Sequence, residues 1–79
     1  MNYTICFLEI VYSKSRIYLN KNGNKYYVDF TYYENEEKHY THSRDLDFDE
    51  AKALFDEVSN MMIRALYSDS DKAKKVKDF

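Results

Sequence analysis

The dipeptide Asn22-Gly23 is the strongest constraint on the fold of this chain, and it contains the only glycine among the 79 residues. Residues 16–21 before it and 25–34 after it are rich in Tyr, Ile, Val and Phe, side chains that suit a pleated strand. Asn-Gly readily adopts the positive φ angles that a two-residue type I′ turn requires. The pattern therefore predicts a β-hairpin.

Two registers of this hairpin are compatible with the sequence. A turn at Asn22-Gly23 pairs Ile17 with Val28, so that apolar side chains meet on one face. A turn at Gly23-Asn24 shifts the pairs but keeps the same side chains on each face. Both turns therefore predict the same two faces of the sheet.

The connection at residues 35–37 joins the third predicted strand to a fourth at residues 38–43. A three-residue loop opposes Glu34 with Lys38, whereas a two-residue loop opposes Glu34 with Glu37. Opposite charges directly across two strands stabilise the pair, and like charges destabilise it. We therefore predict the three-residue loop.

Strand-like segments are followed by a single helical pattern. Residues 3–12 and 38–43 share the β-type composition of the central hairpin. Apolar side chains then recur at three- and four-residue steps over residues 51–65, which predicts a helix from about residue 48 to 67, with Asp47 as its N-cap. The predicted fold class is α+β: a four-stranded antiparallel β-meander followed by one amphipathic α-helix packed on one sheet face.

Length and composition limit the chain to one domain. A chain of 79 residues has no room for a second core, and a hydrophobic content of 44% is ordinary for a folded protein. We predict a single α+β domain over residues 1–67. Residues 68–79 are rich in Asp, Ser and Lys and have little to bury, so we expect a charged C-terminal tail that is frayed or extends the helix.

The predicted helix can cover only one face of the sheet. On the third strand, Val28 and Phe30 belong to the covered face. Tyr18, Tyr27 and Tyr33 belong to the opposite face, and tyrosine combines a large contact area with a hydroxyl group. These three tyrosines are candidate partner-binding residues.

The first predicted strand, residues 3–12, is apolar on both faces. In a meander it lies at the edge of the sheet, where an uncovered apolar strand tends to associate with another chain. Three arrangements would cover the apolar faces of this strand: a different strand order, a homodimer, or contact with another protein. We therefore expect a homodimer or a partner interface at this strand.

Acidic side chains are concentrated in the middle of the chain. Residues 34–57 contain nine acidic and three basic side chains, although the net charge of the whole chain is only −2. Such an acidic band complements a partner protein with a basic surface. Its candidate partner-binding residues are Glu34, Glu36, Glu37, Asp45, Asp47, Asp49 and Glu50.

The sequence contains no recognisable catalytic motif. His39 and His42 are three residues apart on a predicted strand, so they should point to opposite faces, which suits a metal poorly. We expect no enzyme activity, no cofactor and no metal. Cys6 is the only cysteine, and neither a secretory signal nor a membrane-spanning stretch is recognisable, which favours a cytoplasmic protein without membrane contact.

The chain is short, is rich in Asn, Lys, Tyr, Asp and Glu, and combines an acidic run with a predicted sheet and helix. In these features it resembles the small proteins with which bacteriophages and mobile elements block host defence, including anti-CRISPR proteins. The resemblance implies an inhibitor of a nucleic-acid-handling enzyme, in which carboxylates take the place of DNA phosphates. The net charge of −2 departs from a whole-surface DNA mimic, so mimicry would be local at most.

Three non-catalytic functions follow. The first is a protein-binding inhibitor or adaptor that uses the acidic band and the tyrosine face. The second is a structural homodimer joined through the first strand. The third is direct binding of single-stranded nucleic acid, which is disfavoured because the aromatic face lies beside the acidic band.

Overall fold

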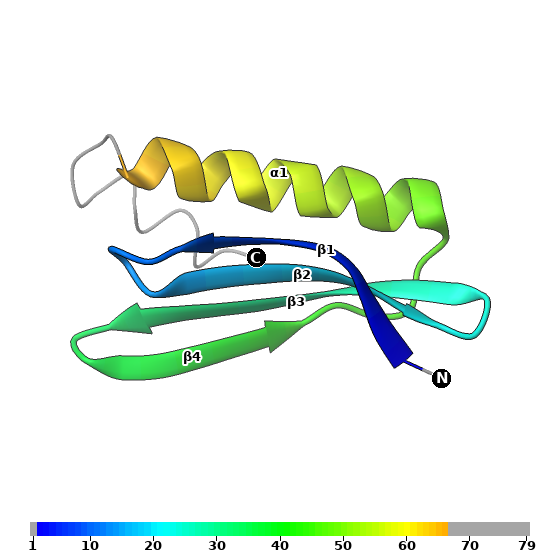
Figure 1. The fold of residues 1–79 in the computed structure, drawn as a ribbon, viewed down its shortest axis with the longest axis horizontal. Helices are drawn as coiled ribbons and strands as arrows, with labels where there is room; N and C mark the ends of the chain where they lie inside the picture. Colours follow the sequence, from blue (N-terminus) through cyan, green and yellow to red (C-terminus); the bar gives the residue numbers. More distant parts are fainter. Residues whose placement is uncertain (1, 67–79) are drawn as a thin grey trace.

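The computed structural model describes residues 2–66, which form one antiparallel sheet and one helix (Figure 1). The predicted α+β class is confirmed, and the strands lie side by side in chain order. The elements are β1 (Asn2–Ile10), β2 (Ser15–Asn22), β3 (Lys25–Glu34), β4 (Glu37–His42) and α1 (Phe48–Leu66). The predicted C-terminal tail lies outside the described residues.

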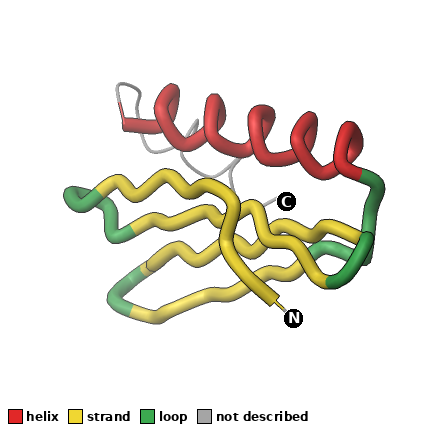
Figure 2. The backbone as a smooth tube through the Cα atoms, turned by 45° about the vertical axis from the view of Figure 1, so that its right-hand side comes forward, coloured by secondary structure: helices red, strands yellow, loops and turns green. Residues whose placement is uncertain are grey.

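The hydrophobic core lies between α1 and the two central strands. Ile17 and Leu19 of β2 and Val28 and Phe30 of β3 are fully buried, because alternate side chains point to the face that the helix covers. Figure 2 shows α1 as a separate layer along that face. The helix contributes a stripe of buried side chains, Ala51, Phe55, Val58 and Met62. The predicted covered face is therefore confirmed.

The turn between β2 and β3 is formed by Gly23-Asn24, the second of the two registers that the sequence allows. Ile17 lies opposite Phe30, and Leu19 lies opposite Val28. Gly23 has a φ of 64°, which a type II′ turn requires at its first central position. This register pairs the four fully buried strand residues with one another, which explains why it is preferred.

The connection between β3 and β4 differs from the predicted three-residue loop. It has two residues, Asn35-Glu36, and Glu34 lies opposite Glu37. Both loop residues have positive φ angles, 52° and 66°, as in a type I′ turn. The like-charge pair lies at the end of the hairpin, where such repulsion costs on the order of 0.5 kcal/mol. The observed register places Asp29 opposite His42, and a hydrogen bond to a charged group contributes roughly 1.5–3 kcal/mol.

This one-residue change of register reverses the two faces of β4. The predicted loop paired Tyr40 with Tyr32 on the helix side. In the structure, Tyr40 lies opposite Thr31 on the other side, and His39 takes the place opposite Tyr32. Because side chains alternate along a strand, every β4 side chain moves to the face opposite the predicted one.

Replacing Glu36 by glycine should stabilise the domain. A left-handed conformation costs a residue with a Cβ atom roughly 1–2 kcal/mol, and Glu36 has a φ of 66°. Part of this gain is lost because glycine is more flexible in the unfolded chain. We expect Glu36→Gly to raise the free energy of unfolding by about 0.5–1 kcal/mol in urea denaturation followed by circular dichroism. Glu37→Gly, within β4, should lower it; a gain there as well would contradict the turn geometry.

A backbone bridge positions the start of α1. The N–H of Tyr26 donates to the carbonyl of Leu46 (2.9 Å), and the N–H of Leu46 donates to the carbonyl of Tyr26 (2.7 Å). The Asp47 carbonyl accepts the N–H of Ala51 (2.9 Å), which places Asp47 at the predicted N-cap position. Its carboxylate pairs with Lys25 (3.2 Å). No helix in the described part of the chain is long and apolar enough to cross a membrane.

β1 is an edge strand with a β-bulge. Thr4 lies opposite Asn20, but the next paired residue is Cys6, so Ile5 is an extra residue in the pairing of β1 with β2. The strand bends near its N-terminal end, which is dark blue in Figure 1. The bulge breaks the simple alternation, because it places Thr4 on the same side of the sheet as Phe7.

Candidate binding face

One face of the sheet is covered by no described element, and we call it the open face. It lies opposite α1 and draws side chains from all four strands, as the register shows: Phe7 lies opposite Tyr18, Tyr18 opposite Asp29, and Asp29 opposite His42. The open face comprises Thr4, Phe7, Glu9, Arg16, Tyr18, Asn20, Tyr27, Asp29, Thr31, Tyr33, Lys38, Tyr40 and His42.

The open face contains a cavity of about 530 Å³ beside the β1–β2 and β3–β4 turns. This volume falls in the range of small-ligand sites, roughly 300–1,000 Å³. The cavity can therefore receive side chains of a partner or one small ligand. Its lining consists of Glu9, Val11, Lys14, Arg16, Tyr18, Thr31, Tyr33, Lys38 and Tyr40.

The lining of the cavity carries more positive than negative charge. Arg16 Nε lies 2.6 Å from Glu9 Oε2, so these two charges neutralise each other. Lys14 Nζ lies 5.6 Å from the centroid of the Tyr33 ring, within cation–π range. Lys38 is exposed. The two lysines leave an excess of positive charge, which favours an acidic or other anionic group in the cavity.

Aromatic rings supply the contact area of the open face. The rings of Phe7 and Tyr18 stack with centroids 5.7 Å apart. Tyr33 and Tyr40 are 40% and 60% exposed. Such rings can bury a large area on binding at a low cost in side-chain entropy.

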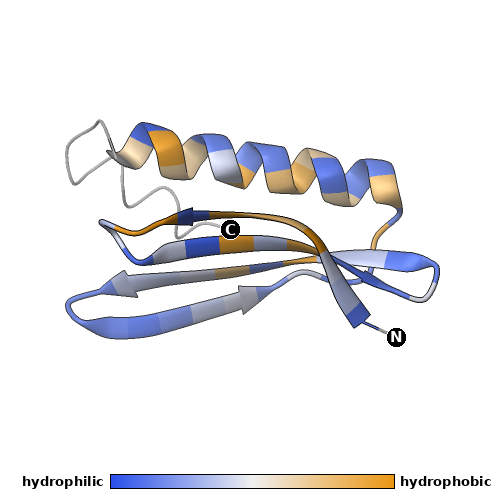
Figure 3. Ribbon diagram, in the orientation of Figure 1, coloured by the Kyte–Doolittle hydropathy of each residue, from blue (hydrophilic) through white to orange (hydrophobic). Residues whose placement is uncertain are grey.

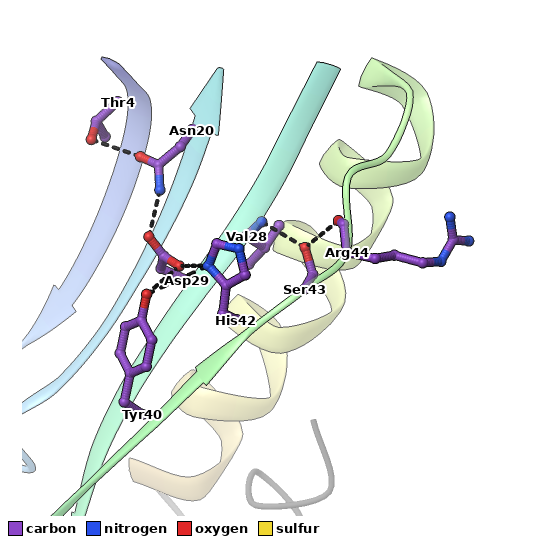
Figure 4. Close-up of polar contacts among 8 residues, drawn as sticks. All are labelled: Thr4, Asn20, Val28, Asp29, Tyr40, His42, Ser43 and Arg44. Carbon is purple, nitrogen blue, oxygen red and sulfur yellow. Dashed lines mark hydrogen bonds and ion pairs between the residues drawn. The ribbon is translucent and has the colours of Figure 1, made fainter. Parts of the chain in front are cut away.

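A ladder of hydrogen bonds crosses the open face from β1 to β4 (Figure 4). Thr4 Oγ1 donates to Asn20 Oδ1 (2.7 Å), and Asn20 Nδ2 donates to Asp29 Oδ2 (2.8 Å). The Tyr40 hydroxyl donates to Asp29 Oδ1 (2.7 Å), which also lies 2.6 Å from His42 Nδ1. Asn20 is only 5% exposed, so its amide needs these partners. The ladder fixes the four strands to one another and holds the Tyr40 ring at the cavity.

Tyr40 should lose its proton at unusually high pH. Its hydrogen bond to Asp29, together with burial and the negative charge of Asp29, raises the pKa of Tyr40 from 10.0 to about 12. Because the folded-state pKa is raised, the protonated hydroxyl stabilises the fold below pH 10, and this contribution is lost as the pH rises through about 12. An NMR titration of the tyrosine ring carbons should place Tyr40 near pH 12, and Asp29→Asn should lower its midpoint. Equal midpoints in both proteins would contradict the hydrogen bond.

The three predicted tyrosines share the open face, as expected. Tyr18 and Tyr33 line the cavity. Tyr27 packs against the ring of His42, with centroids 4.7 Å apart. Only two of the three tyrosines therefore converge on the cavity.

The predicted acidic band is divided between two ends of the molecule. Its first group lies in and beside the β3–β4 turn, at the left of Figure 1, and its second group lies at the start of α1, at the right. Residues 38–42 of β4 lie between the two groups, a span of roughly 17 Å at about 3.3 Å per residue. In the second group, Asp47 pairs with Lys25, and Glu50 with Arg44. The turn group is Glu34, Glu36 and Glu37; the helix-start group is Asp45, Asp47, Asp49 and Glu50.

The two histidines point to opposite faces, as predicted. His39 stacks on Tyr32 on the helix side, with centroids 5.0 Å apart. His42 contacts Asp29 on the open face. Within residues 2–66, no group of three His, Cys, Asp or Glu side chains is placed to hold a metal ion.

Sequence reasoning missed Lys38 and Tyr40 as members of the open face. The predicted three-residue loop assigned Tyr40 to the helix side of β4 and paired Lys38 with Glu34, whereas Lys38 lies opposite Tyr33. Asn35 is the sequence feature that indicates the two-residue turn, because asparagine tolerates positive φ and is favoured in type I′ turns.

No protein-family model matches this chain, no curated protein matches it, and no solved structure matches its fold. The resemblance to small anti-defence proteins therefore gains no support from a relative.

Proposed function

We propose that this protein is a non-catalytic inhibitor or adaptor that binds a partner protein on its open face. The observation that carries the proposal is the cavity, where tyrosine rings converge on an uncovered surface with charged side chains from β1, β2, β4 and the β1–β2 turn. Aromatic residues surrounded by polar and charged groups are typical of the centre of protein interfaces.

The partner should offer both signs of charge to this end of the molecule. Lys14 and Lys38 at the cavity favour an acidic side chain, whereas Glu36 in the neighbouring turn and Glu37 beside it favour a basic one. The helix-start group lies at the opposite end, and two of its four carboxylates already have cationic partners. The sequence predicts a partner with a basic surface, and we therefore propose that this basic surface contacts only the turn group, beside the β3–β4 turn.

Three pairs of charge reversals test this proposal. Lys14→Glu with Lys38→Glu changes the cavity, and Glu36→Lys with Glu37→Lys changes the turn. Asp45→Lys with Asp49→Lys makes the same change of charge in the helix-start group and is the matched control. All six positions are exposed, so each substitution should cost no more than about 1 kcal/mol, with the largest cost at Asp49, where a cation opposes the dipole of α1.

Each variant and the natural protein would be used for affinity capture from native host cells, with captured proteins quantified by mass spectrometry. We expect both the cavity and the turn variants to lose a partner that the helix-start variant retains. Retention of every partner by the cavity and turn variants, or loss from the helix-start variant alone, would overturn the proposed face.

The resemblance to anti-defence proteins adds a proposed class of partner, a nucleic-acid-handling enzyme such as a CRISPR effector. Addition of the purified protein should then slow DNA cleavage by that enzyme. Glu36→Lys with Glu37→Lys should restore cleavage if the turn carboxylates occupy a DNA-binding surface. Full cleavage in the presence of the natural protein would exclude the enzyme tested.

Single-stranded nucleic acid is a second candidate ligand, and the composition of the cavity favours it. Tyrosine rings can stack on bases, while Lys14 and Lys38 can contact the phosphates. Fluorescence anisotropy with a labelled oligothymidine should show affinity that falls with salt, with a log–log slope near −1.4 for about two contacts. Absence of binding at low salt would exclude this candidate.

A further inference from the structure

We propose that two copies of this chain pair along β1 and form a homodimer, with a sheet that continues from one copy into the other. The axis relating the copies would be twofold, and β1 would pair with itself in antiparallel orientation. This interface is centred on an edge of the sheet and shares Phe7 and Val11 with the open face and its cavity, but it does not depend on the proposed function of that face.

Exposed apolar side chains are concentrated on β1 and the turn that follows it. Five of the nine exposed large apolar side chains of residues 2–66 lie there, with exposed fractions of 42–91%: Tyr3, Ile5, Phe7, Val11 and Tyr12. Since a large aromatic side chain can bury roughly 150–250 Å², these five offer on the order of 500 Å² per copy. Two copies would bury about 1,000 Å² from these side chains alone, close to the roughly 1,200 Å² of small stable interfaces.

The two edges of the sheet differ in polarity (Figure 3). β4 is drawn in blue and pale shades and carries Glu37, Lys38 and two histidines, and charged edges discourage pairing. β1 is orange over much of its length and contains one charged residue, Glu9. Of the features that usually protect an edge, β1 has only its bulge.

The charge of β1 favours a second copy as its partner. Glu9 is the only charged residue between positions 2 and 13, and it pairs with Arg16 at 2.6 Å. Two such edges meet without like-charge repulsion, whereas a strongly charged partner would gain no attraction there. Identical, electrically balanced edges therefore fit one another.

The helix side of β1 is also incompletely covered. α1 packs mainly on β2 and β3, and Cys6, Leu8 and Ile10 are only partly buried at the margin of the core. A second β1 would bring the same three side chains alongside. Dimerisation would thus bury the helix-side residues of β1 that α1 of one copy leaves partly exposed.

Sedimentation equilibrium of the full chain over a wide concentration range tests this proposal. The natural protein should show a dimer mass. Ile5→Lys places a cation in each half of the interface and should raise the dimer Kd by about a hundredfold or more. Ile63→Lys on α1 is the matched control, because Ile63 and Ile5 are both 42% exposed. It should leave the Kd within a few fold.

Amide hydrogen exchange supplies a readout that does not depend on a variant. Residues 2–10 should exchange more slowly at concentrations where the dimer predominates than after dilution, while β4 should exchange equally at both. A monomer at every concentration, a dimer that Ile5→Lys leaves intact, or β1 exchange that does not change with concentration would overturn the proposal. If the protein is a monomer at every concentration, the partner of the β1 edge would be a different chain.

Discussion

Phe30→Ala is expected to remove most of the stability of the domain. Phe30 is fully buried on β3, lies opposite Ile17 and stacks on Tyr32 with ring centroids 5.3 Å apart. Truncating a buried phenylalanine to alanine costs roughly 3–5 kcal/mol, because apolar contacts are lost and a cavity remains. A small domain has a total stability near the low end of the usual range, about 5 kcal/mol. A large fraction of the variant should therefore be unfolded at room temperature.

Phe48→Ala provides the matched control. Phe48 is 44% exposed at the start of α1 and makes one edge-to-face contact with Tyr26, with centroids 5.2 Å apart. Its truncation should cost about 1 kcal/mol. Urea denaturation followed by circular dichroism compares the two variants. Similar midpoints for both would show that Phe30 does not lie at the centre of the core.

The parts of the fold that depend on short-range patterns were predictable from the sequence. The strand Lys25–Glu34 was predicted with its observed bounds, because alternation of apolar side chains and a turn signal mark both of its ends. The helix begins at Phe48, as predicted, and continues to Leu66, the last residue that the structure describes. Since these features are set by side chains near one another in sequence, no knowledge of the other strands was needed.

The composition of the candidate site depended on one turn, and there local reasoning failed. Repulsion between Glu34 and Glu37 favours a three-residue loop when only the nearest pair is considered. The observed register is favoured by contacts that Asp29 makes with Tyr40 and His42, eleven and thirteen residues away. Because the predicted loop was one residue too long, the prediction placed Tyr40 on the helix side of β4 and not on the open face.

The acidic band shows a second limit of sequence reasoning. Glu36 and Asp45 are close in sequence, but the whole length of β4 lies between them. Proximity along an extended strand means separation in space, because each residue advances the chain by about 3.3 Å. A charge run that includes a strand therefore should be divided at that strand before it is assigned to one binding surface.

The second large effect is expected from Asp29, whose carboxylate joins three strands. It accepts a hydrogen bond from Asn20 of β2 and contacts Tyr40 and His42 of β4. Asp29→Ala leaves the Asn20 amide without an acceptor at a site where that residue is 5% exposed. An unsatisfied buried donor costs roughly 1–3 kcal/mol, and the lost contacts to β4 add about 1 kcal/mol. The free energy of unfolding should fall by about 2–4 kcal/mol.

A double-mutant cycle separates this network from simple loss of packing. Tyr40→Phe removes one donor and keeps the ring, so alone it should cost about 1 kcal/mol. If the hydrogen-bond network acts as one unit, Tyr40→Phe should cost much less in the Asp29→Ala background, with a coupling of about 0.5–1 kcal/mol. Strictly additive losses would mean that Asp29 and Tyr40 act independently. Because Tyr40 also lines the cavity, a coupled result predicts that Asp29→Asn weakens partner binding although Asp29 does not line the cavity.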